Sequence, residues 1–399
     1  MKKRIITAAC LALLFHPKVK AQNDTTTVYK KQKLKIEEVN FISSYYTQQG
    51  DNSAVTGGKG TEKLTDIATN IEVVLTKKNA YNRTHQFNLS LGVDSYTSAS
   101  SDKIDPNTVS SASYQDVRVY PSAQYAYKND EKKYIVNAGL SFSAEYDYFS
   151  SGVNFGYAKS SKNNNREFSA KASVFLDTWK VILPVELRNN PSDNQANNGD
   201  MKPRNSYNLG LTYAQVVTKN FQLAFMTDIG YQQGLLGTKF NRVYFDNATV
   251  ASEKLPDTRF KLPAGVRANY FLGDNLVLRS LYRYYTDTWA IQSHTFSFEP
   301  VYKINAFSSI ALPYRFYTQT QAKYFKAINQ HVQGTEFYTS DFDLSQFSSH
   351  MLGLSYHKTD NDRGIFNSRR IHSFELRYGY YSRNNGLQSH IITLALQFK

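Results

Sequence analysis

The stretch Phe87-Asn-Leu-Ser-Leu-Gly-Val-Asp94 carries an apolar side chain at every odd position and a small or polar one at every even position. Because successive side chains of a β-strand point to opposite faces, this alternation predicts a strand with one apolar and one polar face. The same pattern recurs from residue 36 to the C-terminus, in runs of about twelve residues, which is long enough for the tilted ~9–11-residue span of a membrane barrel. Strands of soluble β-sandwiches have about five or six residues, so the runs favour a membrane barrel.

About sixteen such segments follow one another, and their connections alternate in length. With the N-terminus in the periplasm, even-numbered connections should be short turns and odd-numbered ones longer outer loops. Most obey this rule, although 160–166 and 359–370 are long even-numbered turns and some odd-numbered loops are short. We therefore predict an all-β chain that forms a single transmembrane, antiparallel, up-and-down β-barrel of about 16 strands, within a range of about 14–18. The predicted strands are residues 36–47, 64–77, 84–97, 114–127, 133–146, 149–159, 167–178, 205–217, 220–232, 257–271, 276–287, 290–304, 309–323, 347–358, 371–382 and 388–398.

The N-terminal segment has the features of a secretory signal peptide. Lys2, Lys3 and Arg4 precede an apolar run at 5–15, and Val19-Lys-Ala21 fits the small-residue rule for cleavage after Ala21. A buried N-terminal helix is the alternative, disfavoured because the run has no amphipathic face. The run is also shorter than the ~20 residues of a membrane-spanning helix. The predicted domains are a signal peptide (1–21), a periplasmic tail (22–35) and a barrel (36–399) in the cell outer membrane.

Charge and cysteine content narrow the function classes. The one cysteine, Cys10, lies in the signal segment, so the mature chain is expected to lack disulfides, a thiolate nucleophile and a Cys-based metal site. The formal net charge is +14, of which the signal segment carries five charges, and the +9 left on the mature chain is spread over the alternating segments rather than gathered in one stripe. Nucleic acid is therefore not predicted as a partner, and anionic lipid headgroups or an anion-selective lumen account for the charge equally well.

Charged residues recur on the non-lipid face of the predicted strands. At the bilayer midplane, Arg or Lys facing hydrocarbon costs about 2–4 kcal/mol, so these side chains are expected to line a polar lumen. Two interpretations stay open: free arginines would favour anions, whereas arginines paired with Asp or Glu would stiffen the barrel, and the second is preferred. The arginines and the lysine of this set that lie between residues 259 and 315 form a candidate ladder of positive charge along the inner wall. The candidate lumen-lining residues are Asp94, Asp116, Arg118, Glu145, Arg259, Lys261, Arg267, Arg279, Arg283, Asp287, Arg315, Glu375 and Arg377.

Two motifs suggest ligand binding but lack the required spacing. Thr56-Gly-Gly-Lys-Gly-Thr61 superficially resembles a phosphate-binding loop, yet Gly60 interrupts the Lys-Thr pair and strand-like alternation follows. A tight loop at the barrel rim is expected there instead. Asp102 and Asp105 provide two carboxylates, which is too few for a calcium site, so a surface turn is expected. The sequence thus predicts no cofactor-binding and no metal-binding residues.

Some outer-membrane barrels are hydrolases with a Ser–His pair. His294 lies beside Ser293, while His350, His372 and His390 lie near the ends of predicted strands. Catalysis needs a base within hydrogen-bond reach of the nucleophile and a third group that orients the base, and no spacing here compels that arrangement. No catalytic residues are therefore predicted, and the protein is not expected to be an enzyme.

The last predicted strand ends the chain with an apolar stripe. Ile392, Leu394, Leu396 and Phe398 share one face, which is predicted to be outward, and Phe398 stands next to the C-terminus. Outer-membrane proteins characteristically close with such a strand, which their assembly machinery reads. The predicted partners are outer-membrane lipid and the barrel-assembly machinery, with a periplasmic or surface protein as a further class.

Several stretches resemble a family of Gram-negative outer-membrane proteins, of the Bacteroidota in particular, known as domain of unknown function 3570. The likeness spans nearly the whole mature chain and implies an outer-membrane β-barrel, with no established activity and no catalytic residues to carry over. The stretches are Tyr46-Thr-Gln-Gln-Gly50, Ala54-Val-Thr-Gly-Gly-Lys-Gly-Thr-Glu-Lys-Leu64, Asp116-Val-Arg-Val-Tyr-Pro-Ser122, Tyr282-Arg-Tyr-Tyr-Thr-Asp-Thr-Trp-Ala-Ile291, Ser293-His-Thr295 and Pro313-Tyr-Arg-Phe-Tyr317.

Two functions from different classes follow from the predicted barrel. A barrel of about sixteen strands can leave an aqueous channel, so the first hypothesis is a porin-like channel for small polar or anionic solutes. The alternative is a non-conducting barrel that docks or helps assemble a periplasmic or surface protein. An open lumen favours the first and a plugged lumen the second.

Overall fold

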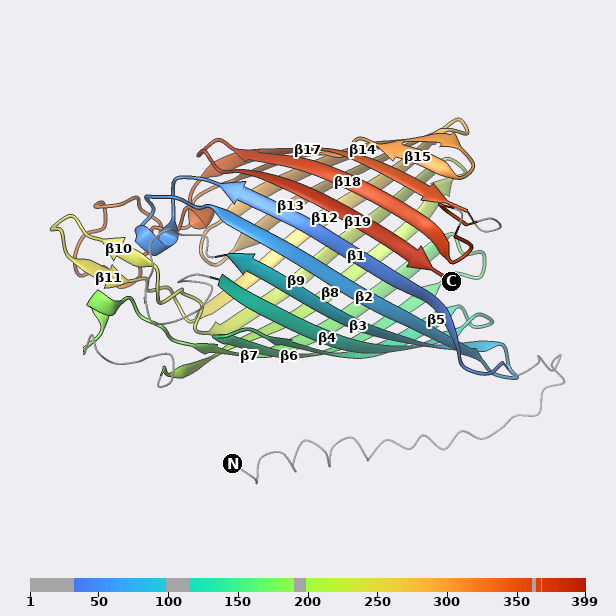
Figure 1. Ribbon diagram of the computed structural model, residues 1–399, viewed down its shortest axis with the longest axis horizontal. Coiled ribbons are helices and arrows are strands. Elements are labelled where there is room, and N and C mark those ends of the chain that lie inside the picture. Colours follow the sequence, from blue (N-terminus) through green and yellow to red (C-terminus); the bar gives the residue numbers. More distant parts are fainter. Residues whose placement is uncertain (1–31, 98–114, 190–198, 361–363, 367) are drawn as a thin grey trace, which may run out of the picture.

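The computed structural model describes residues 32–97, 115–189, 199–360, 364–366 and 368–399. Within these residues one antiparallel sheet closes on itself, because β1 pairs with both β2 and β19 (Figure 1). β15 and β16 both pair with β14 and β17 and so share one place in the sheet, which gives a barrel of 16 strands. The predicted all-β barrel is confirmed. Its strands are β1 (Lys35–Gln49), β2 (Leu64–Lys78), β3 (Arg83–Thr97), β4 (Gln115–Asn129), β5 (Tyr134–Ala144), β6 (Tyr148–Ser160), β7 (Arg166–Lys180), β8 (Met201–Thr218), β9 (Phe221–Gly234), β12 (Thr258–Leu272), β13 (Leu276–Asp287), β14 (Gln292–Asn305), β15 (Ser308–Ala311), β16 (Tyr314–Gln319), β17 (Phe347–Thr359), β18 (Ile371–Arg383) and β19 (Gln388–Phe398).

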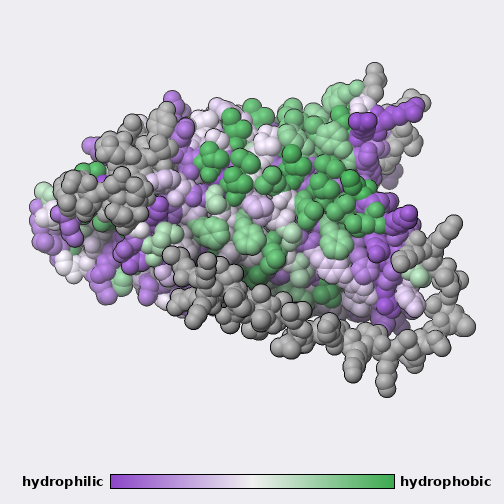
Figure 2. All heavy atoms as spheres, turned by 60° about the horizontal axis from the view of Figure 1, so that its bottom comes forward, coloured by the Kyte–Doolittle hydropathy of each residue, from purple (hydrophilic) through white to green (hydrophobic). Residues whose placement is uncertain are grey.

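The ladder register sorts the side chains onto two faces. Leu89 and Leu91 of β3 pair with Val73 and Ile71 of β2, and paired residues lie on the same face of a sheet. Leu89, Leu91 and Ile71 are all exposed, so this face is the outer surface of the barrel. Figure 2 shows the hydrophobic residues gathered over the wall, with hydrophilic residues at both ends. A closed sheet leaves no unpaired backbone edge, and together with an apolar exterior this is how strands span a membrane.

Helices contribute little to the fold. In the described ranges three short 3-10 helices lie in connections: η2 (Ala54–Thr56), η3 (Val185–Leu187) and η4 (Phe342–Leu344). No helix among the described residues is long and apolar enough to cross a bilayer.

The connections differ at the two ends of the barrel, as the alternating lengths predicted. Residues 219–220 and 273–275 make short turns at the end that also holds the C-terminus. Longer connections, including 235–257 with its hairpin of β10 (Arg242–Tyr244) and β11 (Val250–Ser252), extend from the opposite end (Figure 1). We call that opposite end the outer mouth.

Most predicted strands differ from the observed ones by at most two residues at an end, and three of the differences affect the wall or its connections. The predicted strand at 309–323 is interrupted between β15 and β16 at Pro313, which has no backbone N–H to donate to a ladder, and it stops at Gln319. The predicted strand at 133–146 stops at Ala144, so Glu145 lies in the β5–β6 turn rather than on a strand. The predicted strand at 205–217 begins earlier, at Met201. The predicted signal peptide, residues 22–31 of the tail, and Asp102 and Asp105 lie outside the described residues.

Most of the buried apolar clustering in the described residues lies in the outer connections. One cluster joins Leu236, Trp289, Ile291, Ala322 and Phe325, and a second joins Val55 to Ile182. These connections therefore pack on one another as a folded unit. We call this unit the outer cap, formed by residues 50–63, 181–189, 235–257, 288–291 and 320–346.

A turn at Gly57 and Gly58 positions the first outer connection, residues 50–63, within the outer cap. Gly57 and Gly58 have φ of 78° and 87°, which only glycine adopts readily. A Cβ on Gly57 would lie 2.6 Å from the Tyr244 ring, and one on Gly58 would lie 2.7 Å from the Ser340 carbonyl oxygen. The glycines thus permit both the turn and close contact with two other loops. Since β2 follows, no helix N-terminus is present to bind phosphate.

Candidate functional site

The predicted lumen residues lie on the inner wall, with one exception. Arg283, for example, pairs with Gly265 and Thr295, while its strand neighbour Tyr282 is exposed on the apolar exterior. Glu145 lies in the β5–β6 turn at the outer mouth instead of on a strand. By the same register the inward-facing members are Asp94, Asp116, Arg118, Arg259, Lys261, Arg267, Arg279, Arg283, Asp287, Arg315, Glu375 and Arg377.

Four of the predicted arginines form ion pairs. Arg279 Nη1 lies 2.8 Å from Glu299 Oε1, a cross-strand partner on β14, and Arg377 Nε lies 2.5 Å from Glu375 Oε1. These pairs line a recess of about 500 Å³ on the inner wall between β13 and β19. Paired charges of this kind stiffen the wall and offer little to a passing ion.

The other two ion-paired arginines lie towards the outer mouth. Arg259 pairs with the buried carboxylate of Asp287 and lies 4.2 Å from the centre of the Trp289 ring in the outer cap. Arg118 Nε lies 3.5 Å from Glu145 Oε1, and its Nη1 lies 3.9 Å from Asp94 Oδ2. Both arginines therefore have their charge already balanced by the wall.

Three arginines differ from these. Within the described part of the chain, Arg267, Arg283 and Arg315 have no carboxylate at ion-pair distance. Arg267 pairs across the ladder with Leu281, Leu281 with Ser297, and Ser297 with Arg315, so all three arginines occupy neighbouring inward positions on β12, β13 and β16. We call them the arginine triplet. The predicted basic ladder thus divides into paired members and this triplet, and Lys261 also has no ion pair among the described residues.

The opposite wall is acidic. Strands β2 to β7 turn Asp66, Glu72, Asp94, Asp116 and Asp177 inward, and the β5–β6 turn adds Glu145 and Asp147. In the closed order of sixteen strands these strands face β12 to β18 across the lumen.

Neighbouring side chains on the inner wall donate hydrogen bonds to several of these carboxylates. Tyr120 OH donates to Asp94 at 2.8 Å, and Asn88 Nδ2 donates to Glu72 at 2.9 Å. Arg118 is the nearest cation to Asp94 and Glu145. The acidic wall is therefore largely held by its own hydrogen bonds, and the lumen carries a transverse difference in charge.

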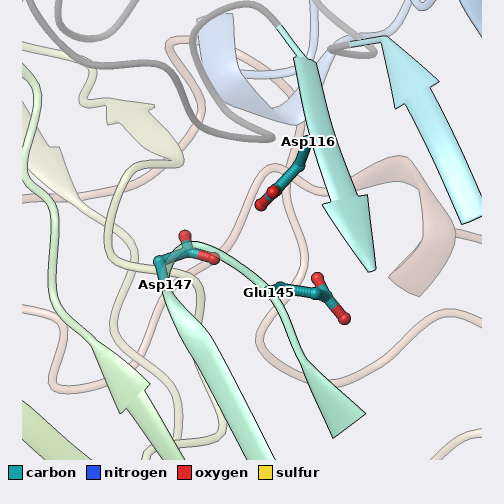
Figure 3. A group of neighbouring side chains, drawn as sticks. All are labelled: Asp116, Glu145 and Asp147. Carbon is teal, nitrogen blue, oxygen red and sulfur yellow. The ribbon is translucent and has the colours of Figure 1, made fainter. Parts of the chain in front are cut away.

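Asp147 is a member of this wall that the sequence patterns did not single out. It is 4% exposed and lies in the turn with Glu145, close to Asp116 (Figure 3). Burial, together with the neighbouring Asp116 and Glu145 charges, raises the pKa of Asp147 to about 6. The sequence pattern extended the preceding strand through residue 146 and so hid the turn that brings these carboxylates together.

The outer cap contacts the inner wall on the basic side. Gln319 of β16 donates to the backbone oxygens of Asp343 and Ser345 at 3.0 and 2.6 Å, and Arg383 of β18 lies 2.5 Å from Asp343 Oδ1. Because Gln319 and Arg383 face inward, the 320–346 connection lies over the inner wall rather than outside the barrel.

His294, His350 and His390 each hydrogen-bond a tyrosine on the outer surface of the barrel. His294 faces outward and hydrogen-bonds Tyr282 at 2.8 Å, while the adjacent Ser293 faces inward. His350 and His390 make the same contact with Tyr314 and Tyr378 at 2.9 and 2.8 Å. These outward Tyr–His pairs are typical of an aromatic belt at the membrane interface.

Comparison with known proteins identifies the family. A family model described as "Protein of unknown function (DUF3570)" matches residues 3–395. The chain belongs to the DUF3570 family. The predicted resemblance is confirmed, and the family description names no activity. No curated protein matches the sequence.

Several solved structures are similar to this DUF3570 chain. They include OccD3 (OpdP) of Pseudomonas aeruginosa, with 10% identity, 92% of this chain and 93% of that chain covered and a TM-score of 0.45. OpdK of the same organism, solved with vanillate, has 6% identity, coverage of 90% and 97% and a TM-score of 0.41. A structure described as a bacterial polysaccharide outer membrane secretin has 8% identity, coverage of 90% and 98% and a TM-score of 0.46.

Proposed function

We propose that this DUF3570 protein is an outer-membrane channel that passes small polar solutes and prefers anionic ones. The observation that carries the proposal is the arginine triplet, whose guanidinium groups face the lumen without a carboxylate at ion-pair distance in the described residues. Rings or ladders of uncompensated positive charge are the usual source of anion preference in pores.

The barrel itself supports conduction. A closed sheet of sixteen strands is wide enough for an aqueous lumen, provided that loops do not fill it. The inner wall is charged on both sides, and charged side chains in a space without water would be strongly disfavoured. The apolar exterior and the long connections at one end support insertion in the outer membrane with the outer cap at the cell surface.

The difference in charge between the acidic and the basic side of the lumen would select anionic solutes in the following way. An anionic group entering at the outer mouth is repelled by the acidic wall of β2 to β7 and attracted towards β12 to β16. A solute with one anionic and one polar or cationic end can satisfy both walls at once. The proposed substrates are therefore small, and carry a carboxylate or phosphate.

Conductance of purified protein in planar bilayers tests the proposal. We expect discrete channel openings and, in a KCl gradient, a reversal potential of the sign that indicates chloride preference. The barrel boiled before insertion is the control for unfolded protein. A protein that is folded, as judged by its heat-dependent mobility in gels, and yet never conducts would overturn the channel function.

A second candidate function is favoured by the outer cap. Its buried apolar clusters and its contacts with Gln319 and Arg383 make it a folded body over the mouth, which suits a non-conducting barrel that docks a periplasmic or surface protein. Cross-linking of intact cells followed by recovery of one stoichiometric partner, together with silent bilayers, would support this function instead.

Assembly is proposed to proceed through β19. Phe398 pairs with Val39 of β1 at the closure of the barrel, and Ile392, Leu394 and Leu396 continue the outward stripe. An aromatic-terminated closing strand of this kind is suited to recognition by the barrel-assembly machinery. Replacing Phe398 with Ser should lower the amount of folded barrel in the membrane, whereas the same change at exposed Phe366 should not.

A further inference from the structure

A group of three carboxylates lies at the outer mouth, where β4 begins and the β5–β6 turn passes beside it. Asp116, Glu145 and Asp147 each offer one oxygen, and these oxygens all lie within 4.8 Å of one another (Figure 3). In Figure 3 Asp116 projects from its strand towards the turn that carries the other two residues. Residues distant in sequence are thus brought together by the ladder of β4 with β5.

Two of the three carboxylates have donors of their own. Glu145 Oε2 accepts from Tyr96 OH at 2.7 Å, and its Oε1 lies 3.5 Å from Arg118 Nε. Asp116 Oδ1 accepts from its neighbouring backbone N–H of Val117 at 2.7 Å. The backbone N–H of Tyr146 also points at the Asp116 carboxylate, at 3.3 and 3.4 Å, so this carboxylate is oriented towards the turn.

Asp147 is the exception. Its side chain is 4% exposed, and its Oδ2 is buried with no hydrogen-bond donor in the described structure. Trp179 is a hydrogen-bonding neighbour of this carboxyl group. A buried carboxylate oxygen without a donor is strongly disfavoured, and the negative charges of Asp116 and Glu145 beside it make the position worse. A cation bound at this point would relieve both penalties.

We propose that Asp116, Glu145 and Asp147 bind one divalent cation, and that the cation is Ca²⁺. Hard oxygen donors are the ligands that Ca²⁺ takes in proteins, at about 2.3–2.6 Å and in flexible geometry. Two oxygens bound to one Ca²⁺ can therefore lie up to about 5 Å apart, whereas Mg²⁺, at about 2.0–2.1 Å, requires them within about 4.2 Å. The oxygens of this cluster all lie within 4.8 Å of one another, a separation that one Ca²⁺ can span.

Water can supply the remaining coordination positions of the ion. Three protein carboxylates with added water correspond to the weaker class of calcium sites, with a Kd on the order of 10⁻⁴–10⁻³ M, as in extracellular modules. Such a site fills only where calcium is abundant, as outside the cell. Its occupancy fastens the start of β4 to the β5–β6 turn and reduces the charge of the acidic wall.

Terbium luminescence tests the site directly, since Tb³⁺ replaces Ca²⁺ and is sensitised by nearby aromatic rings. Trp179, Tyr146 and Tyr148 stand beside the cluster. With the purified, folded, full chain we expect Tb³⁺ emission on excitation of Trp, displaced by millimolar Ca²⁺ and at least about tenfold less well by Mg²⁺. Asp147→Asn should weaken Tb³⁺ binding about tenfold or more.

The matched control is Asp228→Asn on β9, an inward carboxylate three strands along the wall from β6 that should leave Tb³⁺ binding unchanged. Heat-dependent gel mobility verifies that each variant is folded, and Glu145→Gln provides a second variant should Asp147→Asn fail to fold. Tb³⁺ binding that is equal in the wild type and both cluster variants, or that Ca²⁺ does not displace, would overturn the proposal. So would the absence of Tb³⁺ emission from the wild type, which would indicate that a shared proton balances the cluster instead.

Discussion

The two sides of the inner wall treat their charges differently. On β2 to β7 the carboxylates of Glu72, Asp94 and Glu145 accept hydrogen bonds from wall side chains. On β12 to β16 the arginine triplet faces the lumen without an ion pair in the described residues, although Arg279 on the same surface is held by Glu299. The difference teaches that an inward charge is not in itself a functional charge. The ion pair offsets the charge of Arg279, whereas a hydrogen bond from a neutral side chain holds a carboxylate in place without removing its charge.

Removing the arginine triplet should abolish the difference between the two walls and should have the largest effect on ion selectivity. Replacing Arg267, Arg283 and Arg315 together with Gln is expected to lower the chloride-to-potassium permeability ratio about tenfold, because the local anion concentration falls with the wall potential. The reversal potential in a KCl gradient measures the ratio.

The matched control also removes three positive charges, by replacing the exposed residues Lys59, Lys63 and Lys219 with Gln. We expect this control to keep the selectivity of the wild type, apart from a small effect that 1 M salt screens out. If both triple variants shift the ratio equally, net charge and not the triplet sets the selectivity.

A second prediction concerns the cap that covers the basic side. Gly58→Ala places a Cβ 2.7 Å from the Ser340 carbonyl oxygen and at a φ of 87°, which should cost about 1–3 kcal/mol and loosen the 320–346 connection. Trypsin cleavage at exposed Lys326 should then become several-fold faster.

Gly273→Ala is the control for backbone strain alone, because Gly273 has a φ of 61° but a Cβ at this position would have nothing within 4 Å of it. Cleavage at Lys326 should stay at the wild-type rate in this variant. If trypsin cleaves the Gly58 variant at Lys326 as slowly as the wild type, the glycine turn does not hold the loops of the outer cap together.

The cap should also loosen as pH rises. Burial raises the pKa of Glu253, which accepts from the Thr238 N–H and the Thr339 hydroxyl, although Lys239 nearby opposes the shift. Burial and the charges of Asp343, Glu253 and Glu62 raise the pKa of Asp341 well above its usual range. Both groups bind protons more tightly in the folded cap, so their contribution is present at low pH and is lost as pH rises through the folded pKa values.

Hydrogen exchange of the cap amides, corrected for intrinsic exchange rates between pH 4 and 8, measures this loss. Glu253→Gln should flatten the pH dependence, because the amide carries no ionisable proton. Protection that increases with pH in the wild type would contradict the expected direction.

The smallest expected effect comes from converting a paired arginine into a free one. Glu299→Gln removes the partner of Arg279, which lies two inward positions from Arg283 on β13, and should raise the chloride preference about twofold. Glu336→Gln, an exposed change in the outer cap, is the control with equal charge loss. If the Glu299 variant prefers chloride less than the wild type does, Arg279 is not exposed to permeating ions.

Much of the fold could be predicted from the sequence. Period-two alternation is a local property, so the run around Phe87–Asp94 and its successors predict strands, their inward positions and their number without reference to partners. Pro313 shows the limit of this reasoning: the apolar pattern continues through it, but the backbone cannot donate to the ladder there, and the strand divides into β15 and β16.

The candidate site could be predicted only in part. The sequence identifies Arg279 and Arg283 as inward in the same way, because both occupy alternate positions of one strand. Only the register between β13 and β14 decides that Arg279 meets Glu299 while Arg283 meets Thr295. Likewise the burial of Asp147 follows only when the turn brings it to Asp116, which lies on a strand β4 that no local pattern links to it.

The sequence by itself determined a barrel of about sixteen strands with an apolar exterior and a charged interior, because side-chain alternation follows from the geometry of a single strand. The tertiary structure alone decided which interior charges are compensated, where three carboxylates converge and how the outer loops pack into a cap. Those outcomes depend on pairing between residues far apart in the chain, and pairing is set by register and loop packing rather than by any local pattern.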